Sequence, residues 1–240
     1  MNGTTLENTV SSLRNEISVE IADTPALMRE CFQLRHQVYC VERTFLTGEN
    51  GIESDEYDDG SSHAVVRWRH TGQPVGTVRL VLPKSPGGHD DYPIQHVCDQ
   101  ALFRGIPLET TGEVSRFALA KLVRGASPSA SSLLRLALIQ GAVRMSAEAG
   151  HTHWLAVMEP TLIRLLRATG IHFTAVGPLV DYHGLRQPAV AELGPTMARL
   201  AKEQPVVWDF VTDGGRWYSD AAETLPRFVR NARGREAIAA

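Results

Sequence analysis

Apolar and polar residues recur along the chain with two periods, which predict where strands and helices lie. Strict alternation over Ile17–Ile21 is typical of a half-buried strand. Thr24 followed by Pro25 is typical of a helix start, in which a capping side chain precedes a proline at the first helical position. One face of this helix carries apolar residues at spacings of four, three and four: Leu27, Cys31, Leu34 and Val38.

Further along the chain, extended patterns alternate with helical ones. We expect strands over His63–Arg69, Val75–Leu82, Glu113–Leu119, Trp154–Met158 and His172–Val180. Helices are expected over Ser131–Ala149 and from Pro160 to Gly170. This order favours a single α/β (α+β) domain, with one mixed central sheet and helices on both of its faces.

The two ends of the chain differ from this centre. Residues 1–15 are polar, and we expect a flexible N-terminus there. Residues 16–184 contain the predicted sheet and form the core of the domain. Residues 185–240 are expected to be a C-terminal extension packed on the core, with a helix over Pro188–Glu203, a strand over Pro205–Val211 and a turn at Gly214 and Gly215.

Composition narrows the class of protein. The chain has 240 residues, of which 43% are hydrophobic and 21% charged, as in soluble globular proteins and unlike disordered ones. No run of about 18 apolar residues is present, so no transmembrane helix is expected. The first residues lack the basic start and apolar centre of a secretory signal, and we expect a cytoplasmic protein.

Charge is unevenly distributed. The formal net charge of −3 is too close to zero to indicate a nucleic-acid-binding protein. Residues 49–59 hold six of the 27 acidic residues and no lysine or arginine, so the rest of the chain carries 24 basic and 21 acidic residues. One acidic segment therefore interrupts a mildly basic chain.

Cysteine and histidine give no sign of a disulfide framework or a metal site. Cys31, Cys40 and Cys98 are odd in number and widely spaced, as expected for small buried residues in a reducing compartment. His151 and His153 have strand spacing, but no second pair of ligands lies near them in the sequence. We therefore expect no bound metal.

Four segments carry a family resemblance. They are LRHQVY at 34–39, GIESDEYDD at 51–59, GTVRLVLP at 76–83 and GEVSRFAL at 112–119. Their order and spacing resemble those of acyl-homoserine-lactone synthases, and the element order resembles GNAT-type acyltransferases. The resemblance covers residues 17–180. It implies a GNAT-like sheet and an enzyme that transfers an acyl group from a thioester to an amine.

The resemblance also implies site residues. The family's pattern falls on Arg35, Tyr39, Phe45, Asp55, Asp58, Arg79, Glu113, Ser115, Arg116 and Phe117. Aminolysis of a thioester needs a neutral amine, and a carboxylate beside the acceptor can take the proton. We assign this role to Glu113, with the backbone N–H of Phe117 facing the thioester oxygen. The alternative is that Glu113 is a strand-edge residue paired with Arg116.

The other matched residues are expected to bind substrate. Arg35, Asp55, Asp58 and Arg79 are two cations and two carboxylates from three segments, which can order the acidic loop over an acceptor pocket. An ordinary ion-pair network that fastens a loop is the alternative. Strand alternation places Ser115 on the face of Glu113 and turns Arg116 to the opposite face.

Two departures from the autoinducer synthases concern the acceptor. Phe45 stands where those enzymes usually carry a tryptophan that lines the pocket for S-adenosylmethionine, which puts that acceptor in doubt. DYHGLRQP at 181–188 looks more like long-chain N-acyl amino acid synthases and like acyltransferases associated with PEP-CTERM/exosortase systems. The segments SSHAVV and GTVRLVLP resemble the latter group.

A third departure concerns the donor. The phosphate loop of CoA-dependent acetyltransferases would place Ser127 and Ser129 at its glycine positions, with Pro128 between them and no N–H to offer there. The helix start that follows presents Ser129, Ser131 and Ser132 to one phosphate. This favours the phosphopantetheine arm of an acyl carrier protein over CoA. The acyl thioester is expected as a co-substrate, with no bound cofactor.

Three functions are compatible with these observations. The first is an N-acyltransferase that moves a fatty acyl group from acyl carrier protein to the amine of a small acceptor such as an amino acid. The second is an acyl-homoserine-lactone synthase that uses S-adenosylmethionine. The third is a non-catalytic module that binds acyl carrier protein or a ligand, which fold alone does not exclude.

Overall fold

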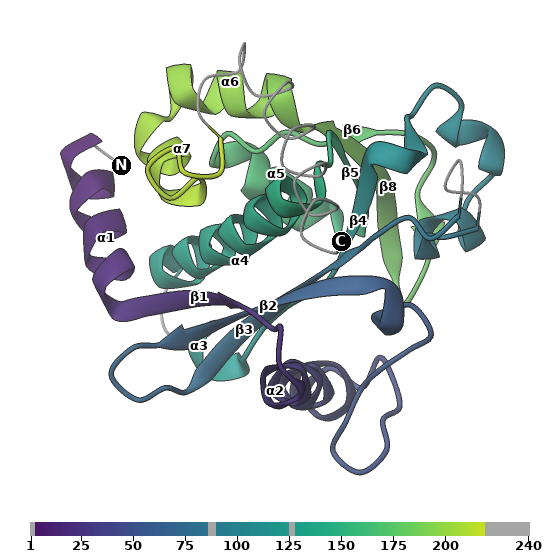
Figure 1. Cartoon of the computed structure of the whole chain (residues 1–240), viewed down its shortest axis with the longest axis horizontal. Helices are drawn as coiled ribbons and strands as arrows, with labels where there is room; N and C mark the ends of the chain where they lie inside the picture. The colour runs from purple at the N-terminus through teal and green to yellow at the C-terminus, as the bar shows by residue number, and fades with distance from the viewer. Residues whose placement is uncertain (1–2, 86–89, 125–127, 219–240) are drawn as a thin grey trace, which may run out of the picture.

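An eight-stranded sheet forms the centre of the computed structural model, which describes residues 3–85, 90–124 and 128–218 (Figure 1). Its strand order is β1-β2-β3-β4-β5-β8-β6, and β7 pairs with β8. β4 and β5 are parallel and all other neighbours are antiparallel. The strands are β1 Ile17–Ile21, β2 Ser61–Trp68, β3 Pro74–Val81, β4 Thr111–Leu119, β5 His153–Met158, β6 Thr174–Ala175, β7 Val180–Asp181 and β8 Leu185–Glu192.

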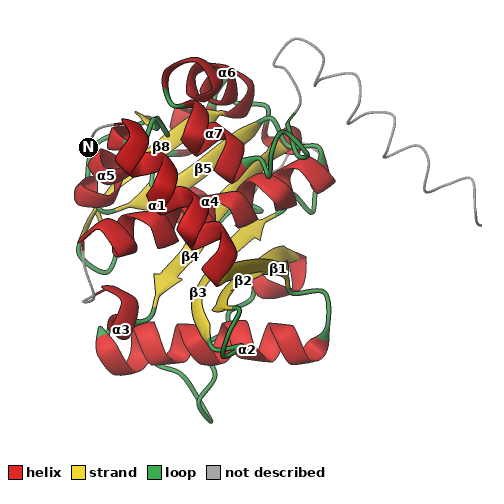
Figure 2. Ribbon diagram, turned by 90° about the vertical axis from the view of Figure 1, so that its left-hand side faces the viewer, coloured by secondary structure: helices red, strands yellow, loops and turns green. Residues whose placement is uncertain are grey.

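Helices cover both faces of the sheet, as the sequence predicts. On one face lies α2 (Pro25–Arg35), capped by Thr24 and continued by a π-helix, His36–Glu42. On the other face lies the long helix α4 (Pro128–Ala149), as Figure 2 shows. The remaining helices are α1 Gly3–Glu16, α3 Lys121–Arg124, α5 Pro160–Ala168, α6 Leu193–Glu203 and α7 Pro205–Val211.

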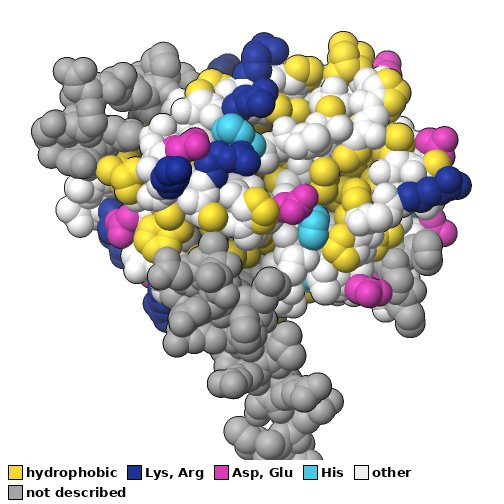
Figure 3. Space-filling view, turned by 90° about the horizontal axis from the view of Figure 1, so that it is seen from above, with side chains coloured by type: hydrophobic (Ala, Val, Ile, Leu, Met, Phe, Trp, Pro, Cys, Tyr) yellow, Lys and Arg dark blue, Asp and Glu magenta, His cyan; other side chains and the backbone are white. Residues whose placement is uncertain are grey.

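The main hydrophobic core lies between the sheet and α4. Leu134, Leu138 and Val143 of α4 are fully buried against Ala64 and Val78 of the central strands. α7 packs on α4 from the outside, and α1 and α6 pack on α7. Seen from above, one part of the face that carries α6 gathers lysine and arginine side chains, and apolar side chains gather beside it (Figure 3).

The structure corrects the predicted N-terminus. Residues 1–15 were expected to be flexible, but Gly3–Glu16 form α1. Val10 and Leu13, three positions apart on this helix, are buried in the main core. The polar composition hides this short apolar stripe, which α7 covers. Tertiary packing therefore stabilises a helix that its own sequence barely signals.

Three predicted elements after residue 170 are also wrong. The single strand over His172–Val180 is replaced by the two-residue strands β6 and β7. The predicted helix start at Pro188 lies in β8, which pairs with β5 at six positions. The predicted strand over Pro205–Val211 is helix α7, because Val207, Phe210 and Val211 face the core at helical spacing. The predicted division between core and extension after residue 184 stays a prediction. The first element after this division is β8.

A bulge and a splay in the middle of the sheet open a space for a site. β3 pairs Arg79 with Ser115 and Thr77 with Ala118, so Arg116 and Phe117 of β4 lie opposite Val78 alone. β4 and β5 pair at three positions, Thr111–Glu113, and beyond Glu113 β5 continues alongside β8. The two parallel strands therefore diverge after Glu113.

Two kinds of feature are lacking in the part of the chain that the structure describes. None of its helices combines the length and the apolar character that crossing a bilayer requires. Nor do three His, Cys, Asp or Glu side chains of these residues gather in a way that could hold a metal ion.

Candidate functional site

A cavity of about 250 Å³ lies where β4 and β5 diverge. Its polar side is formed by Arg79, Glu113, Ser115 and Arg116. Its apolar side comes from α4, the end of β5, α5 and the segment before β6. The apolar lining residues are Ile139, Met158, Leu162, Leu165, Leu166 and Phe173. Tyr39 lines it from the π-helix, Phe45 from the loop that follows, and Arg186 from β8. A polar centre therefore adjoins an apolar pocket.

Glu113 lies at the polar centre and is 2% exposed. Its Oε2 accepts a hydrogen bond of 2.8 Å from the backbone N–H of Ile94. Burial raises the pKa of Glu113 to about 7, although the Ile94 N–H and the charges of Arg79 and Arg116 act in the opposite direction. A carboxylate with this pKa can accept a proton near neutral pH and return it.

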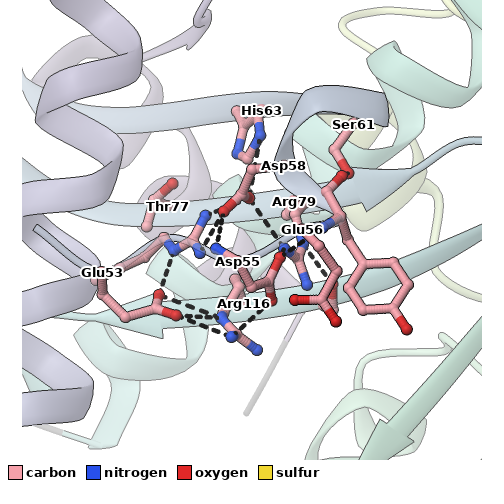
Figure 4. A network of polar contacts seen from close by, with 12 residues as sticks. Glu53, Asp55, Glu56, Asp58, Ser61, His63, Thr77, Arg79 and Arg116 are labelled. Atoms are coloured by element: carbon pink, nitrogen blue, oxygen red, sulfur yellow. Dashed lines mark hydrogen bonds and ion pairs between the residues drawn. The ribbon is translucent and has the colours of Figure 1, made fainter. Parts of the chain in front are cut away.

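Beside Glu113 lies a group of six charged side chains from α2, the acidic loop, β3 and β4, which we call the charge cluster: Arg35, Glu53, Asp55, Asp58, Arg79 and Arg116 (Figure 4). Arg35 donates to both oxygens of Asp58 at 2.7 and 2.9 Å and to Glu53 at 2.5 Å. Arg79 donates to Asp55 and Asp58, and Arg116 to Glu53 and Asp55. Three cations and three carboxylates alternate in this network.

Most of the charge cluster is buried, and Asp55 and Arg116 are partly exposed. Arg35 and Arg79 are 0% and 1% exposed. Burial alone would raise the pKa of the Asp58 carboxyl, but the hydrogen bonds and charge of Arg35, together with Arg79, hold this pKa well below its usual range. The pKa of Glu53 is lowered against burial by Arg35 and Arg116. Asp58 and Glu53 are therefore ionised, and their charge depends on the arginines that contact them.

The prediction for the orientation of Arg116 is wrong. Alternation places its side chain on the face opposite Glu113, but the bulge inserts a residue, and Arg116 adopts a left-handed backbone with φ 47°. Its guanidinium thereby reaches Glu53 and Asp55 on the face of Arg79 and Ser115. The alternative in which Glu113 pairs with Arg116 is also wrong, because Arg116 hydrogen-bonds to the acidic loop.

Phe45 lies at the mouth of the cavity and is 37% exposed. The guanidinium carbons of Arg43 and Arg186 lie 5.4 and 5.8 Å from the centre of its ring. Both arginines pair with Glu159 at the start of α5, at 3.4 and 3.5 Å. Contacts from three segments thus hold Phe45 at the entrance.

Comparison with known proteins identifies the family. The sequence model of the family described as N-acyl amino acid synthase FeeM matches residues 30–192 of this chain. The chain belongs to this family. It is therefore an enzyme, an N-acyltransferase with the autoinducer-synthase type of GNAT fold, as its sequence motifs predict. No curated protein sequence matches the chain.

Solved structures share the fold. The acyl-homoserine-lactone synthase LasI is 20% identical with a TM-score of 0.57, over 72% of this chain and 88% of LasI. The CoA-dependent acyl-homoserine-lactone synthase BjaI, solved with SAM and isopentyl-CoA, is 18% identical with a TM-score of 0.56, over 90% and 99%. FeeM from uncultured soil microbes is 13% identical with a TM-score of 0.53, over 76% and 94%. At these identities the likeness concerns the fold.

Within this FeeM-family fold, the ten residues matched by motif fall into two groups. Tyr39, Phe45, Arg79, Glu113, Ser115, Arg116 and Phe117 line the cavity. Arg35, Asp55 and Asp58 lie behind it and hold Arg79 and Arg116 in place. Ser115 accepts a hydrogen bond from Arg79 Nε at 3.0 Å.

The serines predicted to bind phosphopantetheine have different outcomes. The side chain of Ser129 lies outside the described residues. Ser131 is 4% exposed, and its Oγ accepts a hydrogen bond of 2.8 Å from Arg135. Neither Ser131 nor Ser132 is among the described residues that line the cavity, whereas Arg135, one turn further along α4, does line it.

Several residues of the site were missed at the level of sequence. Glu53 joins Arg35 to Arg116, and its place in the acidic segment two residues before Asp55 was the available signal. His63 Nε2 lies 3.6 Å from Asp58 Oδ1, so His63 is a buried neighbour of the charge cluster. Glu159 and Arg186 have no local signal, because only the fold brings α5 and β8 to the mouth.

Proposed function

We propose that this N-acyltransferase moves a fatty acyl group from acyl carrier protein to the α-amine of an amino acid. The observation that carries the proposal is Glu113, a buried carboxylate with a pKa of about 7 at the junction of a polar centre and an apolar pocket. The polar centre suits an amino acid, and the apolar pocket suits an acyl chain.

In the proposed reaction Glu113 takes a proton from the acceptor's ammonium group, directly or through one water. The amine nitrogen then attacks the thioester carbon, and a C–N bond forms while the carbonyl oxygen becomes an oxyanion. The backbone N–H of Phe117, at the bulge of β4, is assigned to this oxyanion. When the tetrahedral intermediate collapses, the C–S bond breaks, the second amine proton is lost and the thiolate is protonated.

The charge cluster supplies the proposed acceptor contacts. Nη2 of Arg79 is buried and has no hydrogen-bond partner among the described residues. We assign this donor to the acceptor's carboxylate. Arg116 and Ser115 complete that side of the pocket, and Tyr39 and Phe45 enclose it. Arg35, Asp55 and Asp58 act through Arg79 and Arg116 as positioning residues.

Two observations favour acyl carrier protein as the donor. Pro128 removes an N–H from the position where CoA-dependent enzymes carry their phosphate loop. Arg135, which lines the cavity one turn after Ser131, is assigned to a single phosphate, with Ser131 and Ser132 at the start of α4 as further proposed contacts. Ser129 belongs to the same proposed contact.

The second candidate is synthesis of an acyl-homoserine lactone from S-adenosylmethionine. It is favoured by the fold of LasI and BjaI, the latter solved with SAM. Phe45 in place of the usual tryptophan speaks against it. The third function, a non-catalytic module, is at odds with a family of enzymes.

A thiol-release assay separates these functions. We expect faster turnover with acyl carrier protein than with the matched acyl-CoA, and faster turnover with amino acids than with S-adenosylmethionine. Outside residues 49–59 the chain carries more basic than acidic residues, so the KM for an acidic carrier should rise with salt. Faster turnover with acyl-CoA would remove the carrier from the proposal. A lactone product, detected by mass spectrometry, would show that S-adenosylmethionine rather than an amino acid is the acceptor.

Phe173 is expected to limit the length of the acyl chain. Its ring lines the cavity and stacks on Trp154, with ring centres 6.2 Å apart and an interplanar angle of 17°. Trp154 is fully buried and donates to Ser146 Oγ at 2.7 Å, so this wall is fixed. Phe173→Ala should shift the preferred donor to longer chains. It should raise kcat/KM for a donor that is two CH₂ groups longer by about tenfold relative to the shorter donor, since each buried CH₂ is worth about 0.8 kcal/mol.

The measurement is kcat/KM for a series of saturated acyl donors of increasing length. Leu179→Ala is a suitable control, because Leu179 is 45% exposed and is not among the described residues that line the cavity. An unchanged length preference in Phe173→Ala would mean that the chain follows another path.

A further inference from the structure

A second cavity, of about 180 Å³, lies on the side of the sheet that carries α4. It is bounded by α1, β1, the turn after β2, α4, α7 and the turn after α7. It shares no lining residue with the cavity beside Glu113. The reaction proposed above makes no use of it.

The second cavity is strongly basic. Four arginines line it, one each from α1, the turn after β2, α4 and the turn after α7: Arg14, Arg69, Arg144 and Arg216. Asp213 is the one acidic residue among the described lining residues. Four guanidinium groups around so small a volume repel one another, and a bound anion would relieve that repulsion.

The carboxylates already near these arginines leave most of their donors unused. Arg14 pairs with Asp209 at 2.8 Å, Arg144 with Glu148 at 3.0 Å, and Arg216 with Asp213 at 3.8 Å. Arg14 also donates to the backbone oxygen of Asp209 at 2.9 Å. The side chains of the three pairs are between 33% and 68% exposed, and pairs of this kind contribute little. A guanidinium carries five N–H donors, so several remain on each arginine.

Donors without a partner remain on Arg14 and Arg69. Nε of Arg14 is buried and has no hydrogen-bond partner in the described structure. The side chain of Arg69 is exposed and forms no ion pair or hydrogen bond with the described residues. A buried donor without a partner costs free energy, and an anion bound beside Arg14 would remove this cost.

Aromatic rings hold the guanidinium groups in place. Arg144 and Arg216 lie over Trp217, at 5.1 and 4.7 Å from the ring centre, and Arg14 lies 5.8 Å from the centre of Phe210. Stacking restrains a flexible side chain before a ligand arrives, which lowers the entropy lost on binding. The arginines are thus partly preorganised.

From this arrangement we propose that the second cavity binds a small anion with more than one negative charge, carried by phosphate groups. Planar guanidinium forks match phosphate oxygens in pairs, and four of them favour a multiply charged ligand over a single carboxylate. The volume admits a group of the size of a diphosphate and excludes a polymer. Such a group occurs free in solution or on a lipid headgroup.

Calorimetric titration of the full chain with inorganic diphosphate tests the proposal for a free ligand. We expect one site per chain, with affinity that falls as salt is added. Arg69→Ala and Arg144→Ala should each weaken binding at least tenfold. Arg29→Ala is the matched control and should change nothing, because Arg29 is an exposed arginine on α2, on the opposite face of the sheet.

Cosedimentation with phosphatidylcholine vesicles that contain phosphatidic acid tests the lipid source. The site would be assigned to a lipid headgroup if the native protein binds these vesicles but not diphosphate, and if Arg69→Ala abolishes vesicle binding. Failure to bind either probe overturns the proposal, as does binding that Arg69→Ala and Arg144→Ala leave unchanged. Neither readout depends on acyl transfer, so the test stands apart from the proposed function.

Discussion

Replacing Glu113 with glutamine should lower kcat/KM at pH 7 by about 10² to 10⁴-fold, because the acceptor's amine then loses its proton only to solvent. In the native enzyme the acidic limb of the pH–rate profile should have an apparent pKa of about 7, the value that burial gives Glu113. Glu113→Gln should lack this limb. Its deficit should shrink at high pH, where the free amine accumulates.

The same variant should be more stable than the native enzyme in alkaline solution. A carboxyl whose folded pKa is raised from 4.5 to about 7 favours folding in its neutral form, and that contribution is lost as pH rises through 7. Glutamine cannot ionise, so the variant keeps this stabilising contribution at high pH. At about 1.4 kcal/mol per pKa unit, the gain from Glu113→Gln reaches about 3 kcal/mol above pH 7 and vanishes near pH 4.

Urea unfolding at the two pH values measures this gain and shows that the fold is intact. Near-native turnover of Glu113→Gln at pH 7 would exclude Glu113 as the base. A gain in stability without a loss of activity would make Glu113 a buried residue without a catalytic role.

Breaking the pair between Arg35 and Asp58 should be the most destabilising change in the charge cluster. Arg35→Ala leaves three carboxylates with two arginines, and Asp58→Ala leaves the reverse, each in a buried site. Each single variant should lose about 3–5 kcal/mol of stability. Activity should fall too, because Arg79 and Arg116 lose their fixed positions in the cavity.

The double variant Arg35→Ala/Asp58→Ala should be little worse than either single one, since it removes one charge of each sign. The measurements are free energies of unfolding in urea and kcat/KM in a double-mutant cycle. Arg144 and Glu148 provide a comparison, as an exposed pair at 3.0 Å whose cycle should give less than about 1 kcal/mol. Additive losses for Arg35 and Asp58 would mean that they do not act as a unit.

Local signals predicted the elements that frame the site. Thr24 and Pro25 predicted the start of α2, and the helical spacing from Leu27 to Val38 predicted the face that packs on the sheet. Alternation predicted β2, β3 and β4 within two residues at each end. Such patterns are readable because each depends on neighbours three or four residues apart, or on every second residue.

Local patterns gave wrong predictions where an element depends on contacts with distant segments. Pro188 and its neighbours form β8 because β5 offers a partner strand, and Pro205–Val211 form a helix because α4 and α6 cover its apolar face. Intrinsic preferences of about 1 kcal/mol or less per residue are outweighed by such burial. The N-terminal helix α1 follows the same rule, with Val10 and Leu13 as its buried positions.

By itself, the sequence determined the fold class, the family and ten candidate residues. It did so because motifs of fixed spacing specify residue types at positions that the fold brings together. Tertiary structure decided their chemical state and direction. The bulge of β4 turned Arg116 toward Glu53, and complete burial moved the pKa of Glu113 to about 7. Both effects depend on atoms from distant segments, and electrostatic energies in a protein interior follow distance and burial, which sequence spacing does not specify.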